Sequence, residues 1–245
     1  TIGNGRATAI RFAQEGARLL LVDISEVQAK ETLAMIEKEL GKAFKGGWIL
    51  TADITREADC KAIAKTCMDH FGRIDILHNN VGRSRGDTST PDMDAAMWDE
   101  IMAMNLKGMF MTIKHVLPIM RKQKSGSIIN ISSILGLRGF WPGSPAGSIS
   151  YSTSKAGVIG FTRALARELG EHNITVNAVT PGMTLSETQV ATTSGNYSAT
   201  RSVGRAIERD QYPEDLVGAV MFLSSPASDF MTGQTVNVDG GKAMH

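Results

Sequence analysis

Tyr151 and Lys155 lie four residues apart in a stretch with helical character. At that spacing two side chains share one face of a helix, so a phenol and an ammonium group can enter the same site. A nearby positive charge favours the phenolate and lowers the pKa of a tyrosine. We therefore interpret Tyr151 as a candidate proton donor and acceptor near neutral pH. The pair alone is a weak indication, because both residue types are common on the solvated faces of helices.

Two further polar residues precede this pair. Ser133 ends an apolar run that starts at Ser127, and Asn105 lies in an earlier helical stretch. Ser132 competes with Ser133, because neighbouring strand residues point to opposite sides and only one of them can enter a site.

Short apolar runs alternate with longer amphipathic ones along the chain, which is typical of βαβ units with right-handed crossovers. We predict an α/β fold, with a doubly wound parallel sheet flanked by helices in a single domain that covers residues 1–245. Ser25 and Gln28 form a capping pattern at one helix start, and Gly170 stands where a C-terminal glycine is wanted. The predicted strands are 17–24, 46–52, 74–79, 127–132, 175–179 and 234–238, and the predicted helices are 6–14, 26–40, 57–71, 95–120, 152–169 and 213–223.

Composition argues against several classes of partner. The net charge is +1, and acidic and basic residues are mixed along the chain, so neither nucleic acid nor a membrane surface is indicated. The apolar runs are strand-sized, shorter than the roughly 20 residues that cross a bilayer. Cys60 and Cys67 would lie about 10 Å apart along a helix axis, beyond disulfide reach. Two free thiols without a ligand cluster predict a cytoplasmic protein with no metal.

In order and spacing, these residues resemble the motifs of the short-chain dehydrogenase/reductase family. The resemblance covers essentially the whole chain. It implies a Rossmann-type oxidoreductase that moves a hydride between a nicotinamide cofactor and a secondary alcohol or ketone. The residues that carry it are the Gly3-Asn4-Gly5 turn, Asp23, Asp53-Ile54, Asn79-Asn80-Val81-Gly82, Asn105, Ser133, Tyr151, Lys155, Pro181-Gly182 and the closing run from Gly233 to Gly241.

The resemblance assigns a role to each member of the polar set. Tyr151 would be the acid and base, and Lys155 would bind the nicotinamide ribose and hold the tyrosine pKa down. Ser133 would bind the substrate oxygen, and Asn105 would hold a water that connects Lys155 to solvent. A non-catalytic cofactor-sensing protein on the same fold is the alternative from another class, and it would not need the complete set.

Asp23 bears on the choice of cofactor. A carboxylate there can accept hydrogen bonds from the adenosine ribose, and its charge repels the 2′-phosphate of NADP. Since Ile24 and the next two residues add no basic side chain, we predict NAD(H) over NADP(H). The other interpretation is that Asp23 only begins a helix-capping turn. By resemblance, the remaining cofactor contacts are Gly3, Asn4, Gly5, Ile24, Asp53, Ile54, Asn80, Val81, Gly82, Tyr151, Lys155, Pro181, Gly182, Thr184 and Ser186.

The glycine motif is shorter than the family's. Gly3 and Gly5 match its last two glycines, whereas its first glycine and the preceding strand have no counterpart. That strand would lie centrally in the sheet, and each buried backbone group left unpaired costs about 1–3 kcal/mol. We therefore expect the natural chain to begin earlier.

Tyr151 lies 18 positions after Ser133, a longer interval than is usual in the family. We predict that Phe140 and Trp141 in this stretch, together with Leu185, line the substrate pocket, which favours a hydrophobic, aromatic or cyclic alcohol or ketone. The other interpretation is that the stretch packs on a neighbouring subunit. The rival substrate is a 3-oxoacyl thioester on acyl carrier protein, which would want a basic surface near the pocket. The family also implies a homotetramer.

Overall fold

The computed structural model describes residues 2–41, 44–139, 148–187 and 204–244. Its strands are parallel in every pairing, as predicted. One pair consists of β1 (Leu19–Asp23) and β2 (Gly47–Thr51). A four-stranded sheet follows in the order β3 (Ile76–Asn79), β4 (Gly126–Ile131), β5 (Ile174–Pro181) and β6 (Thr235–Val238).

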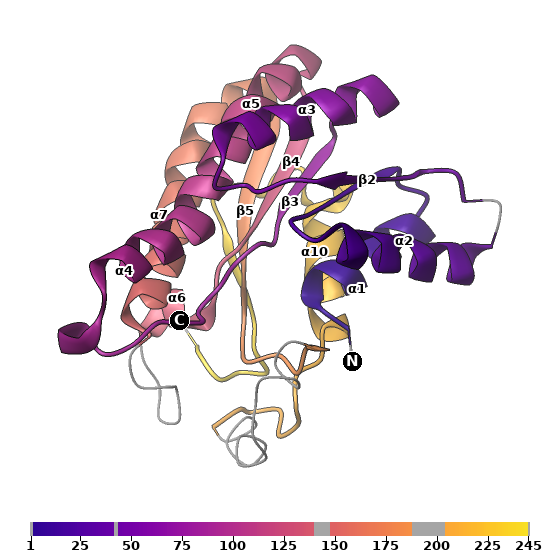
Figure 1. Ribbon diagram of the computed structural model, residues 1–245. Helices are drawn as coiled ribbons and strands as arrows, with labels where there is room; N and C mark the ends of the chain where they lie inside the picture. The colour runs from indigo at the N-terminus through magenta and orange to yellow at the C-terminus, as the bar shows by residue number, and fades with distance from the viewer. Residues whose placement is uncertain (1, 42–43, 140–147, 188–203, 245) are drawn as a thin grey trace.

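Helices cover both sides of the strands, which confirms the α/β class (Figure 1). On one side lie α1 (Asn4–Gln14), α2 (Glu26–Leu40) and α10 (Glu214–Leu223). On the other lie α3 (Glu57–Phe71), α4 (Ala95–Met102), α5 (Gly108–Gln123) and α7 (Ile149–Leu169). A short helix, α6 (Ile134–Arg138), follows β4.

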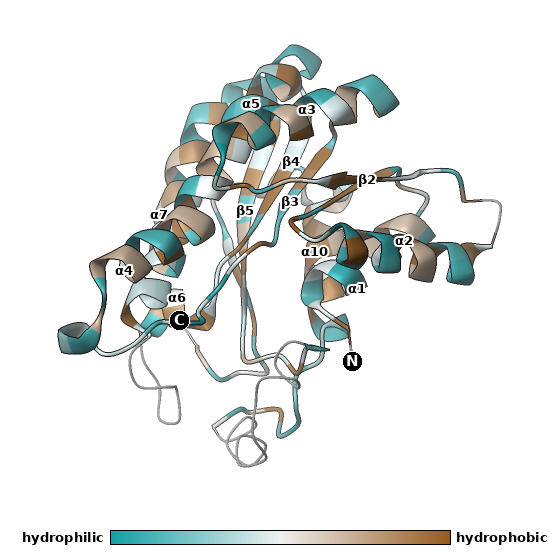
Figure 2. Ribbon diagram, viewed as in Figure 1, coloured by the Kyte–Doolittle hydropathy of each residue, from teal (hydrophilic) through white to brown (hydrophobic). Residues whose placement is uncertain are grey.

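The core consists of two apolar layers, one on each side of the four-stranded sheet. Ile128 and Val176 belong to the layer under α3, α5 and α7, whereas Ile129 and Val179 belong to the layer under α1 and α10. This alternation follows from the two-residue period of a strand. Figure 2 shows the hydrophobic strands between helices with hydrophilic outer faces. Strands buried on both faces need continuous apolar runs, which explains why the sequence pattern predicted them.

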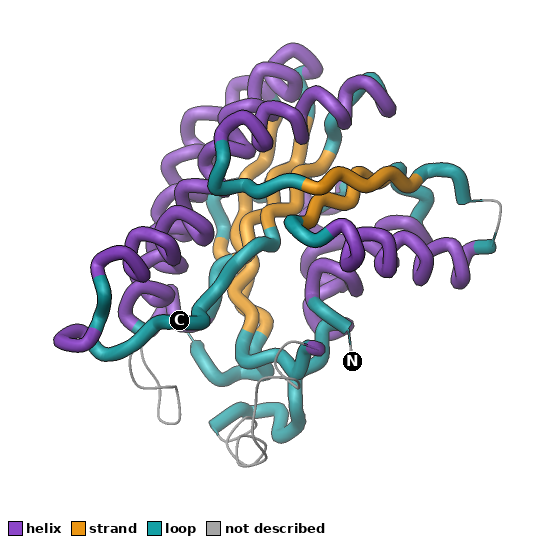
Figure 3. The backbone as a smooth tube through the Cα atoms, in the orientation of Figure 1, coloured by secondary structure: helices purple, strands orange, loops and turns teal. Residues whose placement is uncertain are grey.

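The strands form two groups rather than one continuous sheet (Figure 3). Among the described residues, β1 and β3 are not hydrogen-bonded to each other. The break falls where the family resemblance implies one further strand. The expectation of an earlier chain start stays a prediction.

Two predicted helix features differ from the structure. The stretch 95–120 is not one helix, because a π-helical turn at Ala103–Lys107 separates α4 from α5. Gly170 is the C-cap of α7, as predicted, but its backbone is right-handed rather than left-handed, and a 3₁₀ turn at Gly170–His172 follows directly. The left-handed residue that ends this segment is Asn173, with φ of 55°. Asn tolerates this conformation better than most residues.

Two expected absences can be compared with the described residues. None of the helices within them combines the length and apolar character of a bilayer span. Their His, Cys, Asp and Glu side chains form no group of three that could hold a metal ion. Cys60 and Cys67 are free, and burial raises the pKa of Cys67 to about 11.

Candidate active site

The carboxyl ends of β4 and β5 meet at the lower edge of the molecule in Figure 1, close to the start of α1. Ser133 follows β4 and caps α6, while Tyr151 and Lys155 come from the first two turns of α7. The Ser133 hydroxyl lies close enough to the Tyr151 phenol to lower its pKa. The Lys155 Nζ lies 5.7 Å from the centre of the Tyr151 ring. The structure therefore brings three of the predicted residues into one site.

Lys155 is buried, with 2% of its surface exposed. Its Nζ donates a hydrogen bond of 2.8 Å to the carbonyl of Ile131. Burial lowers the pKa of Lys155 to about 8, because the charged form loses its hydration. At neutral pH the amine is still protonated in most of the molecules.

The pKa of Tyr151 is raised, which differs from the predicted direction. Burial is the larger cause, and the hydrogen bond with Ser133 opposes it. Burial therefore decides the direction of the Tyr151 pKa, and the Lys155 ammonium donates to the Ile131 carbonyl rather than to the phenol oxygen. At neutral pH Tyr151 therefore holds its proton, which is the form that can donate to a carbonyl oxygen.

The two adjacent serines, Ser132 and Ser133, make different contacts. The Ser132 hydroxyl donates 2.7 Å to the backbone carbonyl of Lys155, behind the site. The Ser133 hydroxyl accepts from the Leu135 N–H at 3.2 Å and faces Tyr151. This geometry agrees with Ser133 as the residue that enters the site.

Asn105 lies in the π-helical turn and is fully buried. Its Oδ1 accepts from the Arg83 N–H at 2.8 Å, and its Nδ2 donates to the Arg83 carbonyl at 2.9 Å and to the Ser154 hydroxyl at 3.0 Å. The side chain therefore ties the segment after β3 to α7. Its role in a water relay stays a prediction, with π-helical turns being frequent at functional sites.

The turn before α1 is shaped for close approach of a ligand. Gly3 is the N-cap and makes no side-chain cap, and a Cβ there would meet only open space. A Cβ on Gly5 would lie 2.7 Å from Asn80 Nδ2, so a larger residue there would have to displace the Asn80 side chain. The buried Asn4 Oδ1 has no hydrogen-bond partner in the described chain. Free N–H groups at a helix start and a bare backbone fit a dinucleotide pyrophosphate.

Gly82 lies beside two of the predicted catalytic residues. A Cβ at Gly82 would lie 2.9 Å from Lys155 Nζ and 3.6 Å from Asn105 Oδ1. Val81 beside it is 43% exposed, so this edge of the site is open to solvent. The predicted cofactor segment and the predicted catalytic residues therefore adjoin one another.

Asp23 begins a capping turn, as the alternative interpretation holds: its Oδ1 accepts from the Ser25 N–H at 2.8 Å, and Ser25 caps α2. Within the described chain the other carboxylate oxygen receives no hydrogen bond, so the turn leaves it for a ribose hydroxyl. Ile24 is 66% exposed beside it.

Asp53 is likewise held at one oxygen by the N–H and hydroxyl of Thr55, which lowers its pKa. The adenine contacts of Asp53 and Ile54 stay predictions.

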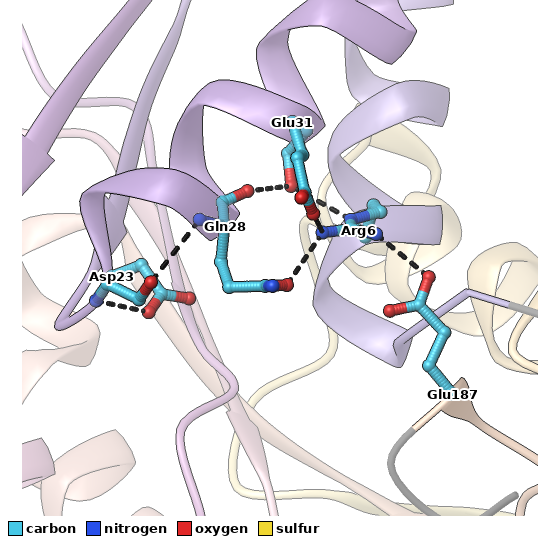
Figure 4. Close-up of polar contacts among 7 residues, drawn as sticks. Arg6, Asp23, Gln28, Glu31 and Glu187 are labelled. Atoms are coloured by element: carbon cyan, nitrogen blue, oxygen red, sulfur yellow. Dashed lines mark hydrogen bonds and ion pairs between the residues drawn. The ribbon is translucent and has the colours of Figure 1, made fainter. Parts of the chain in front are cut away.

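Arg6 is a buried hub that the sequence patterns did not reveal (Figure 4). Its side chain is only 8% exposed. It joins α1 to α2 and to the segment after β5. Its partners are Thr32 at 3.0 Å, Gln28 at 2.9 Å, Glu31 at 3.2 Å and Glu187 at 2.8 Å. No local pattern identifies such a hub, because the partners are 22 to 181 residues away.

The segment after β5 is fastened by backbone contacts. Thr184 bridges to Gln211, and the Leu185 N–H donates 2.7 Å to the Gln211 carbonyl. The buried Arg205 donates 2.6 Å to the Met183 carbonyl, so it holds this segment rather than facing a substrate. These contacts fix the run with the predicted nicotinamide contacts Pro181, Gly182, Thr184 and Ser186. Phe140 and Trp141 lie outside the described residues, so their pocket role stays a prediction.

Fold and site define a nicotinamide-dependent dehydrogenase or reductase of the Rossmann type. The chain belongs to the short-chain dehydrogenase/reductase family. Residues 2–243 match the family model described as enoyl-(acyl carrier protein) reductase.

Curated relatives match along nearly the whole chain. The 3-oxoacyl-[acyl-carrier-protein] reductase FabG of Thermotoga maritima is 38% identical, over 98% of this chain and 93% of its own. The 3-oxoacyl-[acyl-carrier-protein] reductase of a Synechocystis strain is 37% identical, over 99% and 93%. Among solved structures, levodione reductase superposes with a TM-score of 0.90 at 31% identity, covering 98% of this chain and 93% of its own.

Proposed function

We propose that the protein reduces the 3-oxo group of an acyl thioester to a hydroxyl group. The observation that carries the reaction type is the half-buried Tyr151 beside the buried Ser133 and Lys155. The substrate class is supported by the full-length similarity to relatives named 3-oxoacyl-[acyl-carrier-protein] reductase. The sequence left this thioester as the rival substrate, and the similarities favour it over a simple alcohol or ketone.

The chemistry follows from the protonation states. A bound reduced nicotinamide would supply the hydride that reaches the carbonyl carbon. Tyr151 holds its proton at neutral pH and gives it to the carbonyl oxygen, while the Ser133 hydroxyl donates a hydrogen bond to the same oxygen. The ammonium of Lys155 then stabilises the phenolate that forms. Removing a proton donor of this kind costs on the order of 10²–10⁴ in rate.

For the cofactor we propose NAD(H). The support is the charge balance beside α2. Asp23 presents a carboxylate at the ribose position, and Arg6 has its guanidinium occupied by Glu31 and Glu187. The 2′-phosphate of NADP would be repelled by the Asp23 carboxylate. The Arg6 guanidinium would not offset this repulsion, because two carboxylates already neutralise it.

A second candidate is the reduction of a cyclic or hydrophobic ketone, and the similarity to levodione reductase favours it. The predicted aromatic pocket residues Phe140 and Trp141 would suit such a substrate. Assembly as a homotetramer and a cytoplasmic location stay predictions.

The test is a set of initial rates with NADH and NADPH on acetoacetyl thioesters and on cyclic ketones. We expect turnover of the thioester, faster when it is carried by acyl carrier protein than by a small thiol. Tyr151→Phe should abolish turnover and leave cofactor binding intact. Turnover of cyclic ketones alone would select the second candidate, and preference for NADPH would overturn the cofactor proposal.

A further inference from the structure

The helix that carries Tyr151 and Lys155 is capped by a residue far away in the sequence. At the start of α7, Ser148 makes no side-chain cap. The Asp87 carboxylate takes this place: its Oδ2 accepts from the Tyr151 N–H at 2.7 Å and its Oδ1 from the Ser150 N–H at 3.2 Å. The first N–H groups of a helix have no partner within the helix, so a carboxylate there satisfies two of them.

The same peptide is held from its other side. The Tyr151 carbonyl accepts from the Ser154 hydroxyl at 2.7 Å, and Ser154 in turn accepts from Asn105 Nδ2 at 3.0 Å. Asn105 is bound to both backbone groups of Arg83. The short segment from Arg83 to Asp87 therefore reaches the Tyr151 backbone at its nitrogen and, through two side chains, at its oxygen.

We propose that Asp87 is a positioning residue of the reaction, which fixes the Tyr151 backbone so that the phenol meets the substrate oxygen. This inference deepens the proposed function and rests on it. Tyr151 is the third residue of α7, in the turn most prone to fray. A hydrogen bond to an ionised acceptor is about twice as strong as a neutral one, and the helix dipole adds to it. Displacing a catalytic group by about 1 Å can cost on the order of 10²-fold in rate.

The chain offers a matched control. Asp94 is the N-cap of α4 and accepts from the Ala96 N–H at 3.0 Å. It is the same residue type in the same role, on a helix that carries none of the four predicted catalytic residues. Asp94→Ala therefore reports what the loss of an aspartate cap does to this fold in general.

The experiment compares the parent with Asp87→Ala, Asp87→Asn and Asp94→Ala. Steady-state kcat and KM are measured on whichever carbonyl substrate the parent reduces, and NADH affinity is measured by fluorescence. Asp87→Ala should lower kcat on the order of tenfold to a hundredfold, with NADH affinity within about twofold of the parent. Asp94→Ala should leave kcat within about twofold of the parent.

Asp87→Asn serves if Asp87→Ala does not fold. An amide keeps one oxygen acceptor and loses the other, so kcat should fall between those of the parent and Asp87→Ala. Equal kcat in the parent and in the folded Asp87 variants, or an equal loss in Asp94→Ala, would overturn the proposal.

A parent without turnover on any substrate would count against the proposed function instead. Amide hydrogen exchange at Tyr151 then decides on Asp87: faster exchange in Asp87→Asn supports it, and unchanged exchange contradicts it.

Discussion

Replacing Lys155 with methionine should stabilise the fold while it removes the proposed activity. Burial lowers the Lys155 pKa from 10.5 to about 8. One pKa unit corresponds to about 1.4 kcal/mol, so keeping the charge in the folded state costs about 3 kcal/mol. Methionine removes that cost but leaves the Ile131 carbonyl without its hydrogen bond, which takes back about 1–2 kcal/mol. The net gain at pH 7 is about 1–2 kcal/mol, or roughly 2–8 °C in Tm for a chain of this size.

The increase in the free energy of unfolding of Lys155→Met over the parent should become smaller as the pH rises. The folded pKa lies below the unfolded one, so the unfolded chain binds more protons between about pH 8 and pH 10.5. The parent is therefore penalised in full below pH 8 and recovers stability as the pH rises through this window. Urea unfolding of parent and variant at pH 7 and pH 9.5 measures it, and the difference should shrink at the higher pH.

The exposed Lys114, paired with Glu57 at 2.6 Å, provides the control. Its change to methionine should alter the free energy of unfolding by no more than about 0.5 kcal/mol. In parallel, kcat of Lys155→Met should fall on the order of 10²-fold or more. A Lys155→Met protein less stable than the parent at pH 7, or a difference independent of pH, would refute the reasoning.

Three further predictions concern the same fold. Gly82→Ala should weaken NADH binding and lower kcat on the order of tenfold, because its Cβ would lie 2.9 Å from Lys155 Nζ; titration and steady-state rates measure both. Asp23→Asn removes the charge at the ribose position and should shift the NADH-to-NADPH ratio of kcat/KM toward NADPH by roughly tenfold, on the order of 1.4 kcal/mol. Burial lowers the His78 pKa to about 4. The stability that neutral His78 contributes should therefore be fully present above pH 6.5 and be lost as the pH falls toward 4. Urea unfolding across this range checks it, with a weaker pH dependence expected in His78→Leu.

Much of the fold could be predicted because local chemistry encodes it. The bounds of α2 and α3 agree with the predicted ranges 26–40 and 57–71, where Ser25 caps one start and glycines at 41 and 72 end both helices. The buried strands follow from continuous apolar runs. The π-helical turn could not be predicted, because one extra residue per turn scarcely changes the apolar pattern around Asn105.

The candidate site was predicted as a set of residues, but its electrostatics were not. Whether Lys155 or burial decides the Tyr151 pKa depends on where the ammonium points, and spacing along a helix does not contain that information. The partners of Arg6 and Asp87 lie in other elements, with Asp87 and Tyr151 separated by 64 positions. Such contacts leave no periodic trace in the sequence.

The segment after β3 explains why these residues act as one site. Within six residues it places Gly82 against Lys155, Arg83 against Asn105 and Asp87 against the start of α7. Its first residue lies beside Lys155, and its last residue accepts a hydrogen bond from the backbone of Tyr151, the predicted proton donor. The π-helical turn is what allows Asn105 to reach this segment and Ser154 at once. The predicted proton donor and the predicted cofactor contacts are therefore joined by one short segment. A change at its Asp87 end should lower kcat and leave NADH affinity nearly unchanged, whereas a change at its Gly82 end should affect both.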